Sequence, residues 1–234
     1  MNNKTIKISF YINLIIVMFT IFATMIMFTG YKFMNGYEII LESSNLSMLK
    51  FFTVDSNMLM GIVSFIFVIK EYKILNGEKV SITLYDYILK LVSTTAVALT
   101  FFIVFAYLGP ISEHGILSMI MNSNLFFHLL IPVLSIIDFI LYEKNDLIKF
   151  KYTLFGIIPT FIYGIYYFSQ VIIFEKPAFD LYRFVVTYGD DGLPTIHYEK
   201  VAPAIIILLG GVTLLGFIFY FLNKLTIKLD SKVQ

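Results

Sequence analysis

The sequence predicts an all-α polytopic membrane protein, in which a single bundle of six helices spans the bilayer and both termini are cytoplasmic. Three observations support this fold class. Of the 234 residues, 59% are hydrophobic and 14% are charged, and the mean hydropathy of +0.84 is far above that of a soluble domain. The apolar residues gather in six long segments, and Lys and Arg are unevenly shared between successive connections.

Each apolar segment is long enough to cross a bilayer, which requires about 20 residues of helix. The segments are apolar on all sides rather than along one stripe, as expected of spans and not of surface helices. They leave no room for a separate soluble domain, so we expect one integral membrane domain over residues 1–234. The expected spans are residues 8–31, 51–69, 91–108, 123–142, 152–174 and 201–222. The first resembles a signal peptide but is too long for one, so we expect a retained helix.

The positive charges predict the orientation, because Lys and Arg are enriched in cytoplasmic connections. Twelve Lys residues lie in the N-terminus, the second and fourth connections and the C-terminal tail, against five Lys and Arg in the other connections. Both termini are therefore expected in the cytoplasm. The longest connection, residues 175–200, then faces outward, and its Pro, Gly and Asp residues predict a turn-rich cap. The preference for Lys, Phe and Tyr is typical of an AT-rich bacterial genome and suggests a bacterial cytoplasmic membrane.

Polar residues gather at the outer end of the second span, in K-F-F-T-V-D-S-N-M at residues 50–58. At 100° per helical residue, Thr53, Ser56 and Asn57 share one face, whereas Asp55 lies nearly opposite. Asp55 is also close to the helix N-terminus, where a carboxylate is favoured. The segment therefore predicts a polar stripe with one separate acid.

The fourth span carries a similar stripe, because Asn124, His128 and Ser135 lie within about 40° of one another. His128 is the only histidine within an expected span, and an intramembrane ionisable residue is a candidate site. Thr53 is expected roughly 4.5 Å and His128 roughly 7.5 Å below the outer surface. We read Asp138, much deeper on the same helix, as an inner-interface acid near Lys144.

Two stretches resemble the androgen-induced gene 1 family, which includes the androgen-dependent TFPI-regulating protein and many six-span prokaryotic proteins. These are K-F-F-T-V-D-S-N at residues 50–57 and N-L-F-F-H-L-L-I-P-V-L-S-I-I-D at residues 124–138. The resemblance implies a six-helix threonine hydrolase that cleaves fatty-acid esters of hydroxy fatty acids, with Thr53 and His128 as its catalytic pair. The chain departs from the family pattern at Asp55, where Gln is expected, and in E-K-P-A-F-D at residues 175–180.

In such a pair, a neutral imidazole removes the proton of the Thr hydroxyl as that hydroxyl attacks an ester carbonyl. Asn57 and Asn124 are candidate donors to the oxyanion. Asn124, or else Asp55, is a candidate to orient the imidazole. Ser56 would line the same cavity, and Tyr163 and Tyr167 form a stripe on the fifth span that either lines it or packs in the core.

Other classes of protein remain open or are disfavoured. A membrane transporter or binding protein could use the same outer-leaflet cavity, and a catalytically inactive scaffold is a further alternative. The chain has no Cys, no H-E-x-x-H and no G-x-S-x-G, so we expect neither a metal nor a cofactor. The net charge of +1 gives no reason to expect a nucleic-acid partner. The expected partners are the membrane and a lipid-like substrate, and the oligomeric state is left open.

Overall fold

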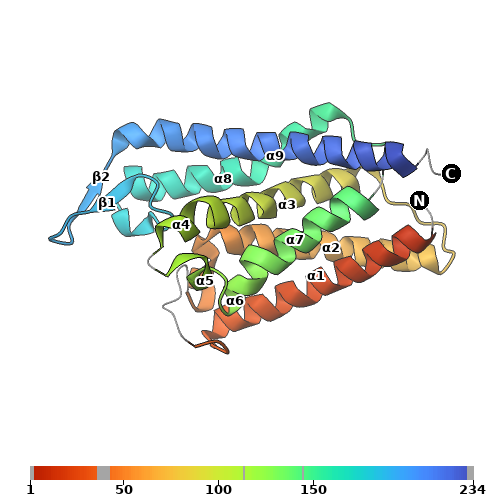
Figure 1. The fold of residues 1–234 in the computed structure, drawn as a ribbon, viewed down its shortest axis with the longest axis horizontal. Coiled ribbons are helices and arrows are strands. Elements are labelled where there is room, and N and C mark those ends of the chain that lie inside the picture. Colours follow the sequence, from red (N-terminus) through yellow and green to blue (C-terminus); the bar gives the residue numbers. More distant parts are fainter. Residues whose placement is uncertain (1–2, 36–42, 113, 144, 231–234) are drawn as a thin grey trace.

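Long helices lying roughly side by side make up almost all of the protein (Figure 1). The computed structural model describes residues 3–35, 43–112, 114–143 and 145–230. Within these residues, six helices are long and apolar enough to cross a membrane, which confirms the predicted all-α six-span bundle. The chain is therefore an integral membrane protein. The six helices cover Asn3–Thr29, Phe52–Leu75, Leu84–Ile111, Ser123–Tyr142, Phe150–Ile173 and Tyr198–Leu229.

Several spans contain more than one kind of helical turn. The first two are the regular helices α1 (Asn3–Thr29) and α2 (Phe52–Leu75). The third joins α3 (Leu84–Ile103), the π-helical turn η2 (Val104–Leu108) and α4 (Gly109–Ile111). The fourth joins α6 (Ser123–Leu125), the π-helical turn η3 (Phe126–Leu130), α7 (Ile131–Ile137) and the π-helical turn η4 (Asp138–Tyr142).

The fifth span joins the 3₁₀ helix η5 (Phe150–Gly156), α8 (Ile157–Phe168) and the π-helical turn η6 (Ser169–Ile173). The sixth is α9 (Val201–Asp230), which follows the 3₁₀ turn η8 (Tyr198–Lys200). The connections contain η1 (Asn45–Lys50), α5 (Gly115–Ser118) and η7 (Pro177–Phe179). They also contain an antiparallel hairpin of β1 (Val186–Tyr188) and β2 (Pro194–Ile196).

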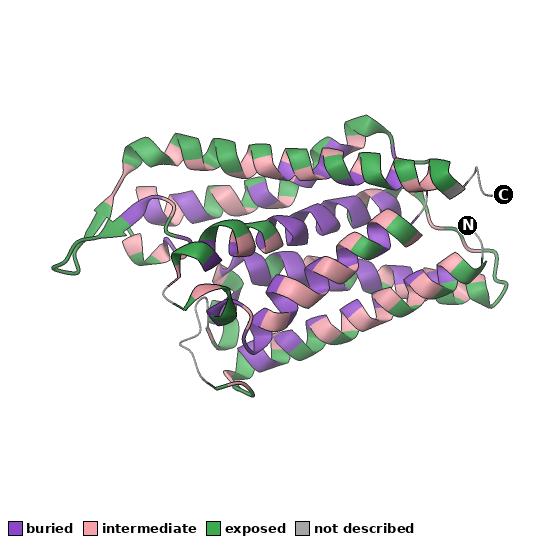
Figure 2. Cartoon of the chain, viewed as in Figure 1, coloured by how far each residue is buried: buried purple, intermediate pink, exposed green. Residues whose placement is uncertain are grey.

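The third span forms the centre of the bundle. Figure 2 shows buried residues along most of α3, whereas α9 is largely exposed on its outer side. A run of small residues, from Ser93 to Ala96, is fully buried and allows neighbouring helices to approach α3 closely. Helices α1 and α2 also pack closely, since a Cβ atom added to Gly61 would lie 2.6 Å from the Thr20 side chain.

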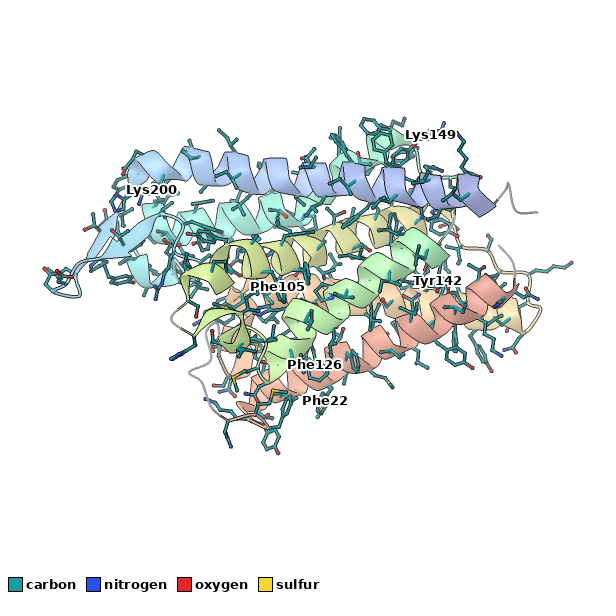
Figure 3. All side chains as sticks on the ribbon, in the orientation of Figure 1. Phe22, Phe105, Phe126, Tyr142, Lys149 and Lys200 are labelled. Carbon is teal, nitrogen blue, oxygen red and sulfur yellow. The ribbon has the colours of Figure 1, made fainter. Side chains whose placement is uncertain are left out.

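The two termini lie at one end of the bundle, and the hairpin lies at the other (Figure 1). Figure 3 shows Tyr142 and Lys149 toward the end with the termini and Lys200 at the end with the hairpin. Such an arrangement is expected of an even number of crossings. With the predicted orientation, the end with the hairpin is the outer end and the end with the termini is the inner end.

The third span begins earlier than the sequence analysis expected. Thr83 and Asp86 form a capping box, in which the Thr83 hydroxyl accepts from the Asp86 backbone N–H at 3.4 Å and the Asp86 carboxylate accepts from the Thr83 N–H at 2.6 Å. The helix therefore starts at Leu84. As a consequence, Lys90 is not part of a cytoplasmic connection but lies inside the bundle, fully buried.

Candidate functional site

Thr53 lies in the first turn of α2 and its side chain is buried. It borders a narrow apolar cavity of about 30 Å³ near the hairpin end of the bundle. The walls come from α2, α3, α8 and α9 and from the connection that holds the hairpin. The lining residues are Phe52, Thr53, Leu99, Thr100, Ile103, Val104, Thr160, Tyr163, Gly164, Tyr167, Phe168, Tyr182, Phe184 and Leu208.

Tyr182 brings a phenol to the polar edge of this cavity. Its hydroxyl oxygen accepts a 3.0 Å hydrogen bond from the Phe52 backbone N–H and also interacts with the Thr53 and Tyr163 side chains. Tyr163 in turn donates to the Lys50 carbonyl oxygen at 2.8 Å. Burial raises the pKa of the Tyr182 phenol above its ordinary value, so the group keeps its proton at neutral pH.

Asp180 fixes the outer connection over the cavity. Its carboxylate accepts hydrogen bonds from the backbone N–H groups of Phe184, Val185 and Val186, at 2.9, 2.8 and 2.5 Å. The Tyr167 hydroxyl also donates to Asp180. Asp180 is the last residue of E-K-P-A-F-D, so this segment, which resembles the family only loosely, anchors the turn that presents Tyr182. The connection is thus an ordered cap.

His128 lies in the π-helical turn η3 and is fully buried. Its Nδ1 atom is 2.5 Å from the Met119 carbonyl oxygen. Because a carbonyl oxygen can only accept, this contact assigns the proton to Nδ1 and leaves a lone pair on Nε2. Nε2 is buried and has no hydrogen-bond partner among the described residues. The imidazole is therefore oriented by Met119, whereas the sequence favoured Asn124 or Asp55 for this part.

Asn57 connects the second and fourth spans beside these residues. Its side-chain amide donates to the Thr53 carbonyl oxygen at 2.7 Å and to the Phe127 carbonyl oxygen at 3.0 Å. Both N–H bonds of the amide are thereby used, so Asn57 holds the backbone in place and has no N–H left for an oxyanion. The two spans that carry Thr53 and His128 are thus neighbours at this level, which topology alone could not establish.

The other residues identified in the sequence take separate positions. The Ser56 hydroxyl donates to the Thr53 carbonyl oxygen at 3.1 Å and lies 3.3 Å from the Thr100 hydroxyl. Asp55 is exposed and, as its helical angle predicts, faces away from Thr53 toward a surface groove along α8. Asn124 is buried at the start of the fourth span.

The structure brings some of the predicted residues to the cavity and leaves others outside its walls. Thr53, Tyr163 and Tyr167 line the cavity, and Tyr163 and Tyr167 belong to its wall rather than to the core alone. Within the described part of the chain, the lining does not include Ser56, Asn57, Asn124 or His128. These four surround the backbone of Thr53 or lie on the neighbouring span.

Sequence reasoning missed Tyr182 and Asp180. Both lie in the segment F-D-L-Y-R-F, residues 179–184, where aromatic residues are unusually dense for an exposed connection. Such density in a polar loop signals that part of the loop is buried, and both side chains are buried here.

A scan against protein-family models found no match to the chain, and no similar protein was found among curated proteins or solved structures.

Proposed function

We propose that the protein hydrolyses apolar, lipid-like carboxylic esters, with Thr53 as the nucleophile and His128 as the general base. By the resemblance described above, fatty-acid esters of hydroxy fatty acids are the substrate class. The observation that carries the proposal is the His128 tautomer, since Met119 holds the proton on Nδ1 and Nε2 is left as an unpartnered base beside the span of Thr53. A neutral imidazole in this state is what proton removal from a hydroxyl requires.

The cavity suits an apolar ester. Its wall is formed mainly by aliphatic and aromatic side chains, and the hydroxyls of Thr53 and Tyr182 lie at one edge. We expect the cavity to widen when an acyl chain enters its apolar part, which adjoins a hollow of about 120 Å³ along α8 and α9, so that the ester carbonyl lies against these hydroxyls. The cavity is near the hairpin end of the bundle, so the predicted orientation puts the reaction in the outer leaflet.

The reaction proceeds in two steps. The Thr53 oxygen attacks the ester carbonyl, its proton moves to His128 Nε2, and the imidazolium returns that proton to the leaving alkoxide. Water then attacks the acylated threonine and releases the fatty acid, with the same imidazole as base. The Tyr182 hydroxyl is the best donor to the developing oxyanion, because its oxygen already accepts from Phe52 and its proton remains available.

Catalysis requires His128 to come closer to the cavity than its present position outside the lining. The residue lies in a π-helical turn, a feature that is frequent at functional sites. Catalytic hydrogen bonds commonly tighten only when substrate binds. We therefore expect η3 to shift toward Thr53 in the substrate complex, with the Asn57 bridge limiting the extent of the shift.

The test is the hydrolysis of a panel of long-chain esters by purified protein. Thr53→Ala and His128→Ala should each lose nearly as much rate as the double variant, because a catalytic pair acts as a unit. Thr53→Ser should retain some activity. The matched control is Thr95→Ala, since Thr95 is also buried but its hydroxyl donates only to Leu91 of its own helix, at 2.7 Å. This variant should keep wild-type activity.

A membrane transporter or binding protein that uses the same cavity would behave differently. It would move or bind a solute in proteoliposomes, hydrolyse none of the esters, and show effects of substitution that follow cavity size. Absence of turnover in the wild type, together with equal labelling of wild type and Thr53→Ala by a hydroxyl-reactive probe, would replace the hydrolase proposal with this one.

A further inference from the structure

A second polar group lies inside the bundle near the end that carries the termini. We call it the inner cluster, and it consists of Ser9, Asn13, Glu71, Lys90, Asp138 and Glu143. All six side chains are fully buried. The inner cluster is far from the cavity, because Glu71 belongs to α2, as Thr53 does, but lies roughly 27 Å farther along that helix at 1.5 Å per residue.

Lys90 is at the centre of the inner cluster. Its ammonium lies 2.7 Å from Asp138 Oδ2 and 3.8 Å from Glu143 Oε1, and it donates to the Asn13 side-chain oxygen. The ring of Phe67 covers it at 4.9 Å. The acid that the sequence placed near Lys144 is therefore paired with Lys90, and Lys144 itself lies outside the described residues.

The inner cluster contains more acceptors than donors. The Asn13 amide nitrogen, which has two protons, lies 3.0 Å from an oxygen of Asp138 and 3.4 Å from oxygens of both Glu71 and Glu143. The Ser9 hydroxyl donates to Glu143 at 3.1 Å. One oxygen of each acid still has no donor among the described residues: Glu71 Oε1, Asp138 Oδ1 and Glu143 Oε2.

Among the described residues, the charges of the inner cluster do not balance either. Three ionised carboxylates around one ammonium would leave two negative charges in a region of low dielectric, which is strongly unfavourable. Lys70 is paired with Asp86 at 2.5 Å, and Lys224 is paired with Asp146 at 3.2 Å, so neither supplies the missing charge. Tyr87, which also faces the acids from α3, is a neutral phenol and adds no positive charge.

Bound protons supply the missing hydrogen-bond donors and also remove the excess negative charge. A protonated carboxyl loses its charge and gains an O–H donor, which can serve one of the unpartnered oxygens. A metal ion is the less suitable occupant, because the described residues contain no group of three or more His, Asp or Glu side chains with metal-binding geometry. We propose that the inner cluster is a proton-binding site, in which two of its three carboxyl groups are protonated at neutral pH around the fixed charge of Lys90.

Ester hydrolysis does not require a proton-binding site at the inner end of the bundle, so the role of the inner cluster is separate from the proposed reaction. The inner cluster joins α1, α2, α3 and the end of the fourth span, so gain or loss of a proton changes the contacts between four spans. Ionisable groups in this position are typical of proton-handling membrane proteins. The protons would come from the inner side, because Glu143 directly follows η4 at the end of the bundle that carries the termini.

Infrared spectroscopy of the full-length protein at neutral pH, in a detergent that contains no ester groups, tests this directly, because protonated carboxyls give a carboxylic C=O stretch that no lipid ester then overlaps. The wild type should show this band, and transfer to D₂O should shift it. Glu71→Gln, Asp138→Asn and Glu143→Gln retain the side-chain shape, and at least two of them should lower the band. Glu78→Gln is the matched control on the exposed loop after α2 and should leave the band unchanged.

Two results would overturn the proposal. One is a wild-type spectrum without a carboxylic C=O band, which requires no variant to fold and means that all three acids are ionised. The other is loss of the band on addition of Na⁺ at constant pH, which would assign the site to a metal cation. Neither result depends on ester hydrolysis. Failure of this inference can therefore be distinguished from failure of the proposed function.

Discussion

The hydroxyl oxygen of Tyr182 accepts a 3.0 Å hydrogen bond from the backbone N–H of Phe52. This N–H belongs to the first turn of α2, where the helix itself offers no acceptor. The Tyr182 side chain thus satisfies the N-terminus of the helix that carries Thr53. Its phenol connects the outer connection, which Asp180 holds in place, to the proposed nucleophile.

We expect Tyr182→Phe to impair both roles of this phenol. Loss of the hydrogen bond to Phe52 should lower the free energy of unfolding by about 1 kcal/mol. Loss of the oxyanion donor should lower kcat about 10²-fold, with a smaller change in KM. Steady-state kinetics and thermal unfolding measure the two effects. Tyr188→Phe, on the exposed hairpin, is the control, and equal kinetics in the two variants would argue against an oxyanion role.

Asp180→Asn tests the cap separately from the chemistry. An amide oxygen can accept only part of what the carboxylate accepts from three backbone N–H groups and Tyr167, and these are charge-assisted bonds. We expect the variant to lose about 2 kcal/mol of stability, measured by thermal unfolding in detergent. Asp190→Asn, on the exposed turn of the hairpin, should be neutral. Equal stability of both variants would mean that Asp180 does not hold the cap.

The cavity should determine the length of acyl chain that is accepted. Gly164 lines the cavity, and a Cβ atom at this position would meet no atom within 4 Å. Gly164→Leu should therefore narrow the cavity, and kcat/KM should fall about 10-fold or more for long-chain esters but little for short ones. The comparison uses an ester series of increasing chain length. An equal fall for all lengths would mean that the chain binds elsewhere.

The six-span bundle was predictable from the sequence, because lipid requires long apolar helices and the segments show them without ambiguity. The shared level of Thr53 and His128 also followed from helical geometry. Helix adjacency did not, since it depends on contacts such as the Asn57 bridge to Phe127, which no periodicity contains. Tyr182 was missed because its contact to Phe52 joins residues 130 positions apart.

The inner cluster was missed for another reason. Lys90 was counted among the cytoplasmic charges, so a buried cluster around it was not expected. Thr83 and Asp86 nevertheless form a recognisable capping pair, which starts the helix about two turns before Lys90. Glu71 and Glu143 were likewise placed in connections, because the expected spans ended at residues 69 and 142. Their burial arises from packing between four helices, which the sequence of any single helix does not reveal.

Removal of the central ammonium should destabilise the bundle in a pH-dependent way. Lys90→Met leaves the one ionised acid of the inner cluster without a counter-charge, and we expect a loss of about 3–5 kcal/mol at neutral pH. Lower pH supplies the compensating proton, so the difference from wild type should shrink as the pH falls. Unfolding at several pH values measures this. Lys79→Met, at an exposed site, should show no loss, and a pH-independent loss in Lys90→Met would argue for mere packing.

The close contact of α1 and α2 should make Gly61 sensitive to any side chain. A Cβ atom there would lie 2.6 Å from Thr20, so Gly61→Ala should separate the helices and cost about 1–3 kcal/mol. Gly210→Ala is the control, because a Cβ atom at that position meets nothing within 4 Å. The free energies of unfolding of Gly61→Ala and Gly210→Ala are each compared with that of the wild type. Equal stabilities would show that Thr20 can move aside without cost.

The most direct measurement of the proposed function is the identification of the covalently labelled residue. Purified protein is treated with a hydroxyl-reactive probe or a slowly hydrolysed ester, and peptide mass spectrometry locates the adduct. We expect the adduct on Thr53, with strong loss of labelling in His128→Ala because the base is missing, and full labelling in Thr95→Ala. An adduct at another residue, or labelling of Thr53→Ala at the wild-type level, would contradict the assignment of Thr53 as the nucleophile.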